Sequence, residues 1–292
     1  MQNLQEYHRP KTVAQAIELL QRTSPKTVVL GGGTWLTGEG ALGNLREVQA
    51  VVDIAELGLN VIETQPAPDF TREPSLYVGA AVTLQTLVEN ELTGVNSANA
   101  LHVIGEAAQA MAGLNIRNRA TIAGAIATAD SSSPLVTALL ACDAEIITQV
   151  NDKAKTLQLA GFLDYRERIL SEGVLITAVR MPLPDANARA SYQAVGRTPR
   201  DYPIVCAVTK VTQLSRGQSA TRVALGGVAP VPIRLMALEF AIDTKPEQDF
   251  LEAELTSVLA PITPQSDYLG SADYRKDMAR VLVRRTVRAT LA

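Results

Sequence analysis

The chain of 292 residues has few of the residues from which metal centres are commonly built. It contains two histidines and two cysteines, and Cys142 and Cys206 lie far apart with no Cys-X-X-Cys pair. This scarcity excludes an iron–sulfur cluster or a four-ligand zinc site held by this chain alone. Two buried free thiols in a reducing compartment are the expectation for these cysteines.

Aromatic residues, net charge and long apolar runs are also limited. Aromatic residues make up 4% of the chain, and the formal net charge is −3. A basic nucleic-acid surface or a platform for stacked bases is therefore not expected. No apolar run reaches the roughly 20 residues that span a bilayer, and no basic-then-apolar leader opens the chain. We expect a cytoplasmic protein without a transmembrane segment.

Two glycine-containing loops are the most informative feature that is present. The first, Leu30-Gly31-Gly32-Gly33-Thr34, follows the apolar run Val28–Leu30, and the second, Arg117–Gly124, follows a helix-like stretch. Consecutive glycines after a strand let the backbone turn sharply and bring main-chain N–H groups close to an anion. Arg117 and Arg119 flank the second loop and can neutralise a diphosphate. The pair predicts a dinucleotide diphosphate held between the loops.

Other glycine motifs do not match. The spacing is not Gly-X-Gly-X-X-Gly and no Gly-Lys-Ser/Thr follows, so a nicotinamide-type Rossmann fold is not expected and a P-loop is excluded. In isolation, either loop could be only a tight turn. No acid/base pair or nucleophile elbow is evident, so acyl or phosphoryl transfer has little support. A flavin carrier needs no such residues, because the isoalloxazine supplies the redox chemistry.

Local patterns predict mixed helices and strands. Thr12–Gln15 is typical of a capping box, and Ser131–Pro134 of a helix start with proline in its first turn. The segment Pro203–Leu214 is ambiguous, and the N-cap pattern Asp201-Tyr202-Pro203 favours a helix. Further predicted elements are strands at 27–30, 48–54, 144–150, 175–181, 190–195 and 221–226, and helices at 84–90, 101–111, 135–141 and 274–291. We expect three parts, at residues 1–57, 58–174 and 175–292.

An ordered set of motifs runs almost from end to end. It comprises the opening at 7–20, the loop at 31–34, VVDIAEL at 51–57, YVGAAVTL at 77–84, IRNRATIAG at 116–124, ALLACDAEI at 138–146, ALGGVAPVPIR at 224–234 and SADYRKDMARVLVRR at 271–285. This set resembles the FAD-binding (medium) subunit of the molybdenum hydroxylases, which include xanthine dehydrogenases and aerobic carbon monoxide dehydrogenases.

The resemblance implies an α+β fold. A two-subdomain FAD-binding domain of the vanillyl-alcohol-oxidase (PCMH) type would be followed by a C-terminal α+β domain with a small antiparallel sheet and helices. Residues 1–57 and 58–174 would be the two subdomains. The implied partners are a molybdopterin-binding large subunit and an iron–sulfur small subunit in a hetero-oligomer. Electrons would pass from the partner clusters through FAD to an external acceptor.

The resemblance also assigns cofactor contacts. The loops would hold the diphosphate and neighbouring groups through main-chain N–H groups, and Tyr202 would lie near the flavin ring or simply pack at a helix start. The residues implied to bind FAD are Leu30, Gly31, Gly32, Gly33, Thr34, Trp35, Ile116, Arg117, Thr121, Ala123, Gly124 and Tyr202.

Several positions depart from the family pattern. Relatives usually have Thr-Ile-Gly-Gly-Asn where this chain has Thr-Ile-Ala-Gly-Ala, so Ala123 would be strained if its φ were positive, and Ala125 lacks the amide. Pro134 stands where relatives often carry a ribose-binding aspartate. Trp35 replaces a small or acidic residue and could stack on a ring or pack in the protein. The alternative function is a diverged structural or assembly subunit with weak or no FAD binding, and a weaker one is a self-contained flavin oxidase.

A stripe of basic residues runs along the predicted last helix. Lys276, Arg280, Arg284 and Arg288 recur every four residues. A solvated helix face is the ordinary interpretation of this pattern, and docking against an acidic partner surface is the alternative.

Overall fold

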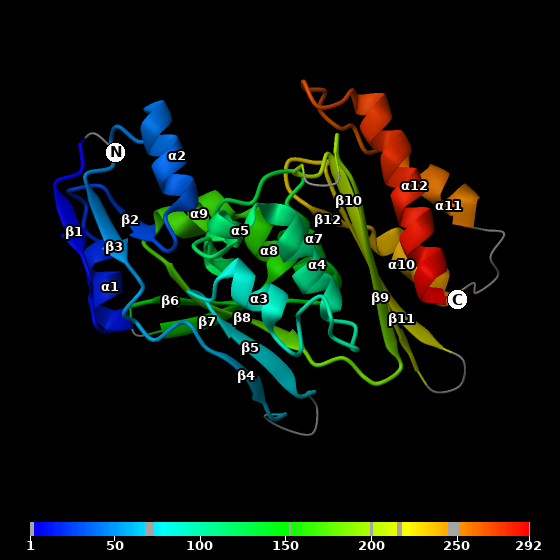
Figure 1. Cartoon of the computed structure of the whole chain (residues 1–292), viewed down its shortest axis with the longest axis horizontal. Helices are drawn as coiled ribbons and strands as arrows, with labels where there is room; N and C mark the ends of the chain where they lie inside the picture. The colour runs from blue at the N-terminus through cyan, green and yellow to red at the C-terminus, as the bar shows by residue number, and fades with distance from the viewer. Residues whose placement is uncertain are drawn as a thin grey trace. The chain divides into compact units, whose positions relative to one another are not determined.

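The computed structural model describes residues 3–67, 73–151, 153–198, 201–214, 218–244 and 251–291. Two compact units make up the chain, and each is discontinuous in sequence (Figure 1). The first unit comprises Met1–Thr86, Leu114–Thr128 and Ala144–Pro182, and the second comprises Leu87–Gly113, Ala129–Asp143 and Leu183–Ala292.

A three-stranded parallel sheet forms one part of the first unit. Its strands are β1 (Glu6–His8), β2 (Thr27–Leu30) and β3 (Ala50–Asp53), in the order β1-β3-β2, with α1 (Val13–Leu20) and α2 (Thr34–Leu42). The predicted cap of α1 is confirmed, because the Gln15 amide donates to Thr12 Oγ1 at 3.3 Å. The Gln15 side chain accepts from the Lys11 amide rather than from that of Thr12. Strand β2 leads directly into the first glycine-containing loop.

A five-stranded antiparallel sheet forms the rest of the first unit. Its order is β4 (Ile62–Gln65), β5 (Ser75–Gly79), β8 (Leu175–Pro182), β6 (Glu145–Val150) and β7 (Lys153–Gln158). The helices of this part are α5 (Leu114–Arg117), α6 (Ile122–Ala127), α8 (Leu159–Asp164) and α9 (Arg166–Ser171). The central strand β8 comes from a segment more than ninety residues after β5 in the chain, so residues 114–128 and 144–182 return to complete this unit.

The second unit combines a four-stranded antiparallel sheet with helices, as the resemblance implied. The sheet order is β12 (Ile233–Arg234), β11 (Ser219–Gly226), β10 (Val205–Gln213) and β9 (Ala188–Val195). The helices are α4 (His102–Met111), α7 (Pro134–Ala141), α10 (Met236–Thr244), α11 (Leu251–Leu259) and α12 (Ala272–Leu291). Val205, Leu225, Leu238, Leu255 and Val283 belong to one buried core cluster of this unit. A further helix, α3 (Leu84–Glu89), begins after Thr83, whose hydroxyl accepts from the Thr86 amide as a cap.

The helix favoured for Pro203–Leu214 is wrong, because this segment forms strand β10. Both neighbours in the sheet, β9 and β11, pair with it in long antiparallel registers. Helices α7 and α12 both contact it, and residues 205–211 are all buried. A strand that is buried on both faces shows no polar–apolar alternation, which is why its sequence resembled a helix.

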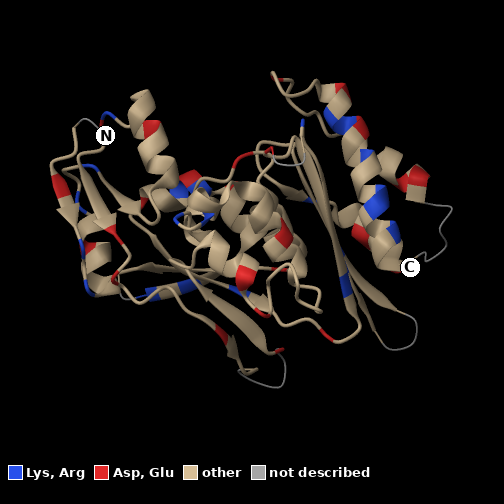
Figure 2. Ribbon diagram, in the orientation of Figure 1, with Lys and Arg blue, Asp and Glu red and all other residues tan. Residues whose placement is uncertain are grey.

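Basic residues lie along α12, as Figure 2 shows in blue. Lys276 donates to the Ala260 carbonyl at 2.8 Å, and Arg284 pairs with Glu252 at 3.1 Å. Part of the stripe therefore serves contacts within the second unit. Within the described ranges, no helix is both long and apolar enough to cross a membrane.

Candidate functional site

The two glycine-containing loops touch each other in the first unit. A Cβ atom placed on Gly32 would lie 1.5 Å from the Arg119 carbonyl oxygen, and one on Gly31 would lie 2.8 Å from Thr121 Oγ1. A distance of 1.5 Å to a backbone atom is incompatible with any side chain. The glycines are therefore required for the close approach of the two loops, which were predicted to act together.

The first loop ends in the open N-terminus of α2. Gly33 is its N-cap, with φ of +76°, and makes no side-chain capping bond. The first-turn N–H groups of an α-helix have no acceptor within the helix. Together with the helix dipole, such groups favour an anion. Residues 34–36 therefore present main-chain donors beside the point where the loops meet.

The second loop uses its amides within the protein. Thr121 is the N-cap of α6, and its hydroxyl accepts from the Gly124 amide at 3.1 Å. The Ile122 amide donates to the Val82 carbonyl at 2.9 Å, and the Ala123 amide donates to the Ala80 carbonyl at 3.3 Å. All three amides of the second loop therefore donate to acceptors within the first unit.

The strain expected if Ala123 had a positive φ does not occur. Ala123 lies inside α6, and the described non-glycine residues with positive φ are Asp143 and Asn151. An L-residue adopts the α-helical conformation without penalty. The replacement of a family glycine by Ala123 is therefore compatible with this backbone.

Charged and apolar side chains surround the loops. Arg117 donates through Nε to Gln85 Oε1 at 2.9 Å, whereas Arg119 is exposed. Trp35 is 46% exposed and Ile116 is 48% exposed. The surroundings of the loops thus offer an exposed cation and two accessible apolar side chains.

A buried aspartate that is not among the predicted site residues ends the strand beside the first loop. Asp53 pairs in register with Leu30, and its carboxylate accepts from the Tyr7 hydroxyl, Arg9 Nε and the Ala55 amide. Burial opposes ionisation of Asp53, yet these hydrogen bonds hold its pKa below the ordinary value. The position of this aspartate at a predicted strand end was the available signal.

Tyr202 belongs to the second unit, where it precedes β10 instead of starting a helix. Its hydroxyl donates to Asp130 Oδ1 at 3.1 Å. Burial, followed by the nearby Asp130 carboxylate, raises the pKa of Tyr202 above the ordinary range, so the phenol stays protonated. Pro134, which departs from the family pattern, is buried as the first residue of α7. Asp130 was missed because its partner lies 72 residues away.

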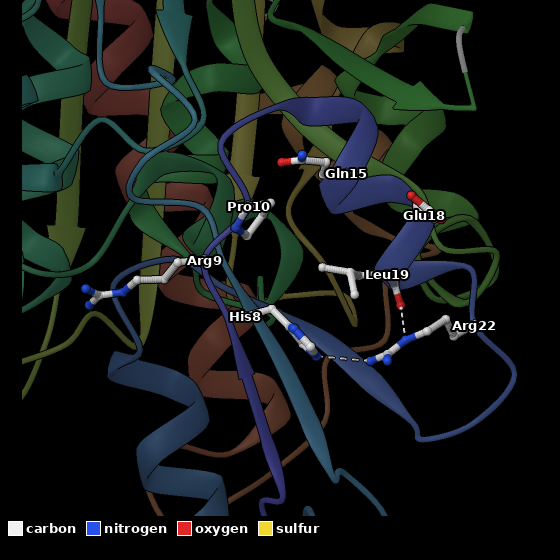
Figure 3. Close-up of a pocket in the computed structure, with 7 residues that line it drawn as sticks. All are labelled: His8, Arg9, Pro10, Gln15, Glu18, Leu19 and Arg22. Atoms are coloured by element: carbon white, nitrogen blue, oxygen red, sulfur yellow. Dashed lines mark hydrogen bonds between the residues drawn. The ribbon is translucent and has the colours of Figure 1, made fainter.

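A separate cavity of about 400 Å³ opens in the first unit between the end of β1 and α1 (Figure 3). It is lined by His8, Arg9, Pro10, Gln15, Glu18, Leu19 and Arg22. Near it, Glu6 accepts from His8 at 2.7 Å and from Arg22 at 2.9 Å, and these hydrogen bonds lower the pKa of Glu6. None of the predicted cofactor residues lines this cavity, and its basic groups already have an acidic partner.

The chain matches two protein-family models. The FAD binding domain in molybdopterin dehydrogenase matches residues 2–184, and the CO dehydrogenase flavoprotein C-terminal domain matches residues 190–290. These matches confirm the family suggested by the motifs.

Individual relatives extend over nearly the whole chain. The carbon monoxide dehydrogenase medium chain of Afipia carboxidovorans is 27% identical, over 97% of this chain and 95% of that protein. The putative xanthine dehydrogenase FAD-binding subunit XdhB of Escherichia coli is 28% identical, over 98% of this chain and 96% of that protein. A structure of carbon monoxide dehydrogenase from Hydrogenophaga pseudoflava matches with a TM-score of 0.86 at 26% identity, covering 98% of this chain and 97% of that one.

Proposed function

The chain belongs to the family of FAD-binding domains of molybdopterin dehydrogenases, and from this premise we propose that it is the electron-transferring flavin subunit of a molybdenum-containing hydroxylase. FAD is the cofactor of this family. When bound, FAD supplies reversible electron transfer, and the protein supplies binding, orientation and polarity. The open N-terminus of α2 against the second loop is the observation that carries the proposal.

The residues present fit the diphosphate of FAD. The three glycines of the first loop carry no side chain, and the first-turn amides at Thr34 and Trp35 are directed by helix geometry toward an incoming anion. Exposed Arg119 adds positive charge beside them. We assign direct binding to Gly31–Trp35. Leu30 and Ile116 would flank it, and the second loop would support it.

The second loop and Tyr202 have different proposed roles. The amides of Ala123 and Gly124 already have acceptors, and Thr121 caps α6, so these residues would brace the first loop. Arg117 donates a hydrogen bond to Gln85 and would in this way orient the chain between α5 and α6. The assignment of Tyr202, in the second unit, to the flavin contacts follows from the resemblance alone and stays a prediction.

Electrons would arrive from another chain. With two cysteines in total, this chain cannot hold an iron–sulfur cluster alone, so we propose an iron–sulfur small subunit as donor and a molybdopterin-binding large subunit as the substrate-oxidising partner. FAD would pass the electrons to an external acceptor. Burial raises the pKa of Cys142 to about 11 and that of Cys206 to about 12, so neither thiol is a reactive thiolate. Two unpaired thiols suit a cytoplasmic complex.

Domain division forms part of the same proposal. Residues 1–57 and 58–174 would be the subdomains of the FAD-binding part, and residues 175–292 the C-terminal domain. Limited proteolysis of the full chain, with mass spectrometry of the fragments, tests this division. Val174 is buried and strand β8 follows it directly, so cleavage is expected near residue 57 and at the exposed residues 185–187 after β8, and protection of both regions would contradict the division.

Reconstitution with FAD tests the proposed function. Full-length protein incubated with FAD and desalted should retain visible flavin absorbance. Gly32→Ala should lose it, because the new Cβ cannot fit against the Arg119 carbonyl. Gly38→Ala is the matched control, since nothing lies within 4 Å of a Cβ placed on this residue of α2. Wild-type protein that stays colourless would contradict the proposal.

A structural or assembly subunit is the second candidate function. The observations that favour it are the engaged amides of residues 122–124, together with Ala125 and Pro134 in place of polar family residues. Flavin retention by wild-type protein distinguishes the two functions, with an Ala123→Gly variant as the control. Flavin retention by wild type and variant alike supports the flavin subunit, whereas retention by neither, with intact assembly of the complex, supports the structural subunit.

A further inference from the structure

Trp35 is a large aromatic side chain that the first unit leaves partly uncovered. It is the single tryptophan of the chain, it is the second residue of α2, and it is 46% exposed. The buried residues of α2 are Leu36 and Gly40, so the helix packs by a different face. The indole N–H has no hydrogen-bond partner among the described residues. Large aromatic side chains are normally well buried, with their polar atoms bonded.

This side chain stands beside the anion-binding donors assigned above. Its own amide is one of the first-turn N–H groups of α2, and residues 31–33 of the preceding loop are glycines without side chains. A diphosphate of FAD bound at these amides brings the attached adenosine and riboflavin into the same neighbourhood. One face of a half-exposed indole is then available to a planar ring.

Resting on the proposed function, we propose that Trp35 is a stacking residue of the FAD site. Its indole lies against an aromatic ring of the nucleotide whose diphosphate is held at the first turn of α2. Stacking of this kind supplies affinity without requiring particular hydrogen bonds. Such a contribution is needed here because three amides of the second loop are already used within the protein.

Binding measurements on full-length variants test this role. Trp35→Ala should weaken FAD binding about tenfold, and Trp35→Phe, which keeps an aromatic ring, should stay within about threefold of wild type. Anisotropy of flavin fluorescence gives the dissociation constants directly. Leu42→Ala is the control, since this residue on the same helix is 74% exposed and lies two turns away from the loops. It should bind FAD like wild type.

Fragments of FAD identify the ring that Trp35 contacts. FMN and ADP are titrated separately into wild type and Trp35→Ala, and the loss of affinity should appear for the fragment that carries the stacked ring. In wild type, the emission of the single tryptophan reports the same contact independently. For ADP, which does not absorb this emission, a change in intensity would indicate adenine.

The outcomes separate this inference from the proposed function. Failure of wild-type protein to bind FAD would contradict the proposed function itself. If wild type binds FAD and Trp35→Ala binds it within twofold of wild type, with an unchanged circular dichroism spectrum, the stacking role is overturned. A loss shown by Trp35→Ala and largely recovered in Trp35→Phe supports it.

Discussion

The two glycine-containing loops of the first unit differ in how their main-chain donors are used. The first loop ends at an uncapped helix N-terminus, and its glycines permit contact with the second loop. In the second loop, Ile122, Ala123 and Gly124 all donate to acceptors within the protein. The two loops therefore serve different tasks. One loop presents donors, and the other holds the first in place.

This comparison explains which glycine each loop can lose. Gly32 cannot carry a side chain because backbone of the second loop fills that space. Ala123 is tolerated because its backbone is helical and its methyl group is buried in the protein. A departure from the family pattern in the second loop is thus less serious than the same change in the first.

The largest effect is expected for Gly32→Ala in the absence of FAD. The new methyl group forces the two loops apart, and we expect a loss of about 3 kcal/mol in the free energy of unfolding. Urea unfolding followed by circular dichroism measures it, with Gly38→Ala as the control. A loss below about 0.5 kcal/mol would show that the loops separate freely and that their contact does not require glycine at position 32.

Removing the cap of α6 should affect stability more than cofactor binding. Thr121→Ala deletes the acceptor of the Gly124 amide, and we expect a loss of about 1 kcal/mol in unfolding free energy. Thr121→Ser keeps the hydroxyl and should restore most of it. FAD affinity should change little, because Thr121 supports the loop rather than the cofactor. A large loss of affinity with unchanged stability would instead assign direct cofactor contact to the second loop.

Acid should lower the stability of the strands beside the first loop, where Asp53 lies. The pKa of Asp53 is held below its ordinary value of about 4, so its ionised form contributes stability above that value, and the contribution is lost as the pH falls through the lowered pKa. Asp53→Asn should cost about 1 kcal/mol at pH 7, because an amide accepts the hydrogen bonds less well. The urea midpoint should fall less between neutral and acidic pH in Asp53→Asn than in wild type. An equal fall in both proteins would exclude Asp53 as the source.

Local sequence predicted much of this arrangement. The apolar strand before Gly31, the proline-led start of α7, the Thr12 cap of α1 and the long helix α12 each depend on neighbouring residues, and each is confirmed. The ordered motifs identified the family because they sample the whole chain.

The remaining features depend on contacts between distant residues. Strand β10 is fixed by two partner strands and by helices on both faces, none of which its own sequence reveals. The conformation of Ala123 is set by acceptors at Ala80 and Val82, some forty residues earlier in the chain. Likewise, Asp130 gains its role only when the fold brings Tyr202 to it. Residue type alone carried no signal for these pairings.

The smallest effect is expected for Ala123→Gly, the change that restores the family residue. If this position required a positive φ, glycine would relieve strain and stabilise the protein. Because Ala123 lies within α6, glycine should instead destabilise it by about 0.5–1 kcal/mol through the added freedom of the unfolded chain. The unfolding free energy decides the sign, and a stabilised variant would contradict the helical assignment. FAD affinity should not improve, since the Ala123 amide already donates to Ala80 and the substitution leaves that hydrogen bond in place.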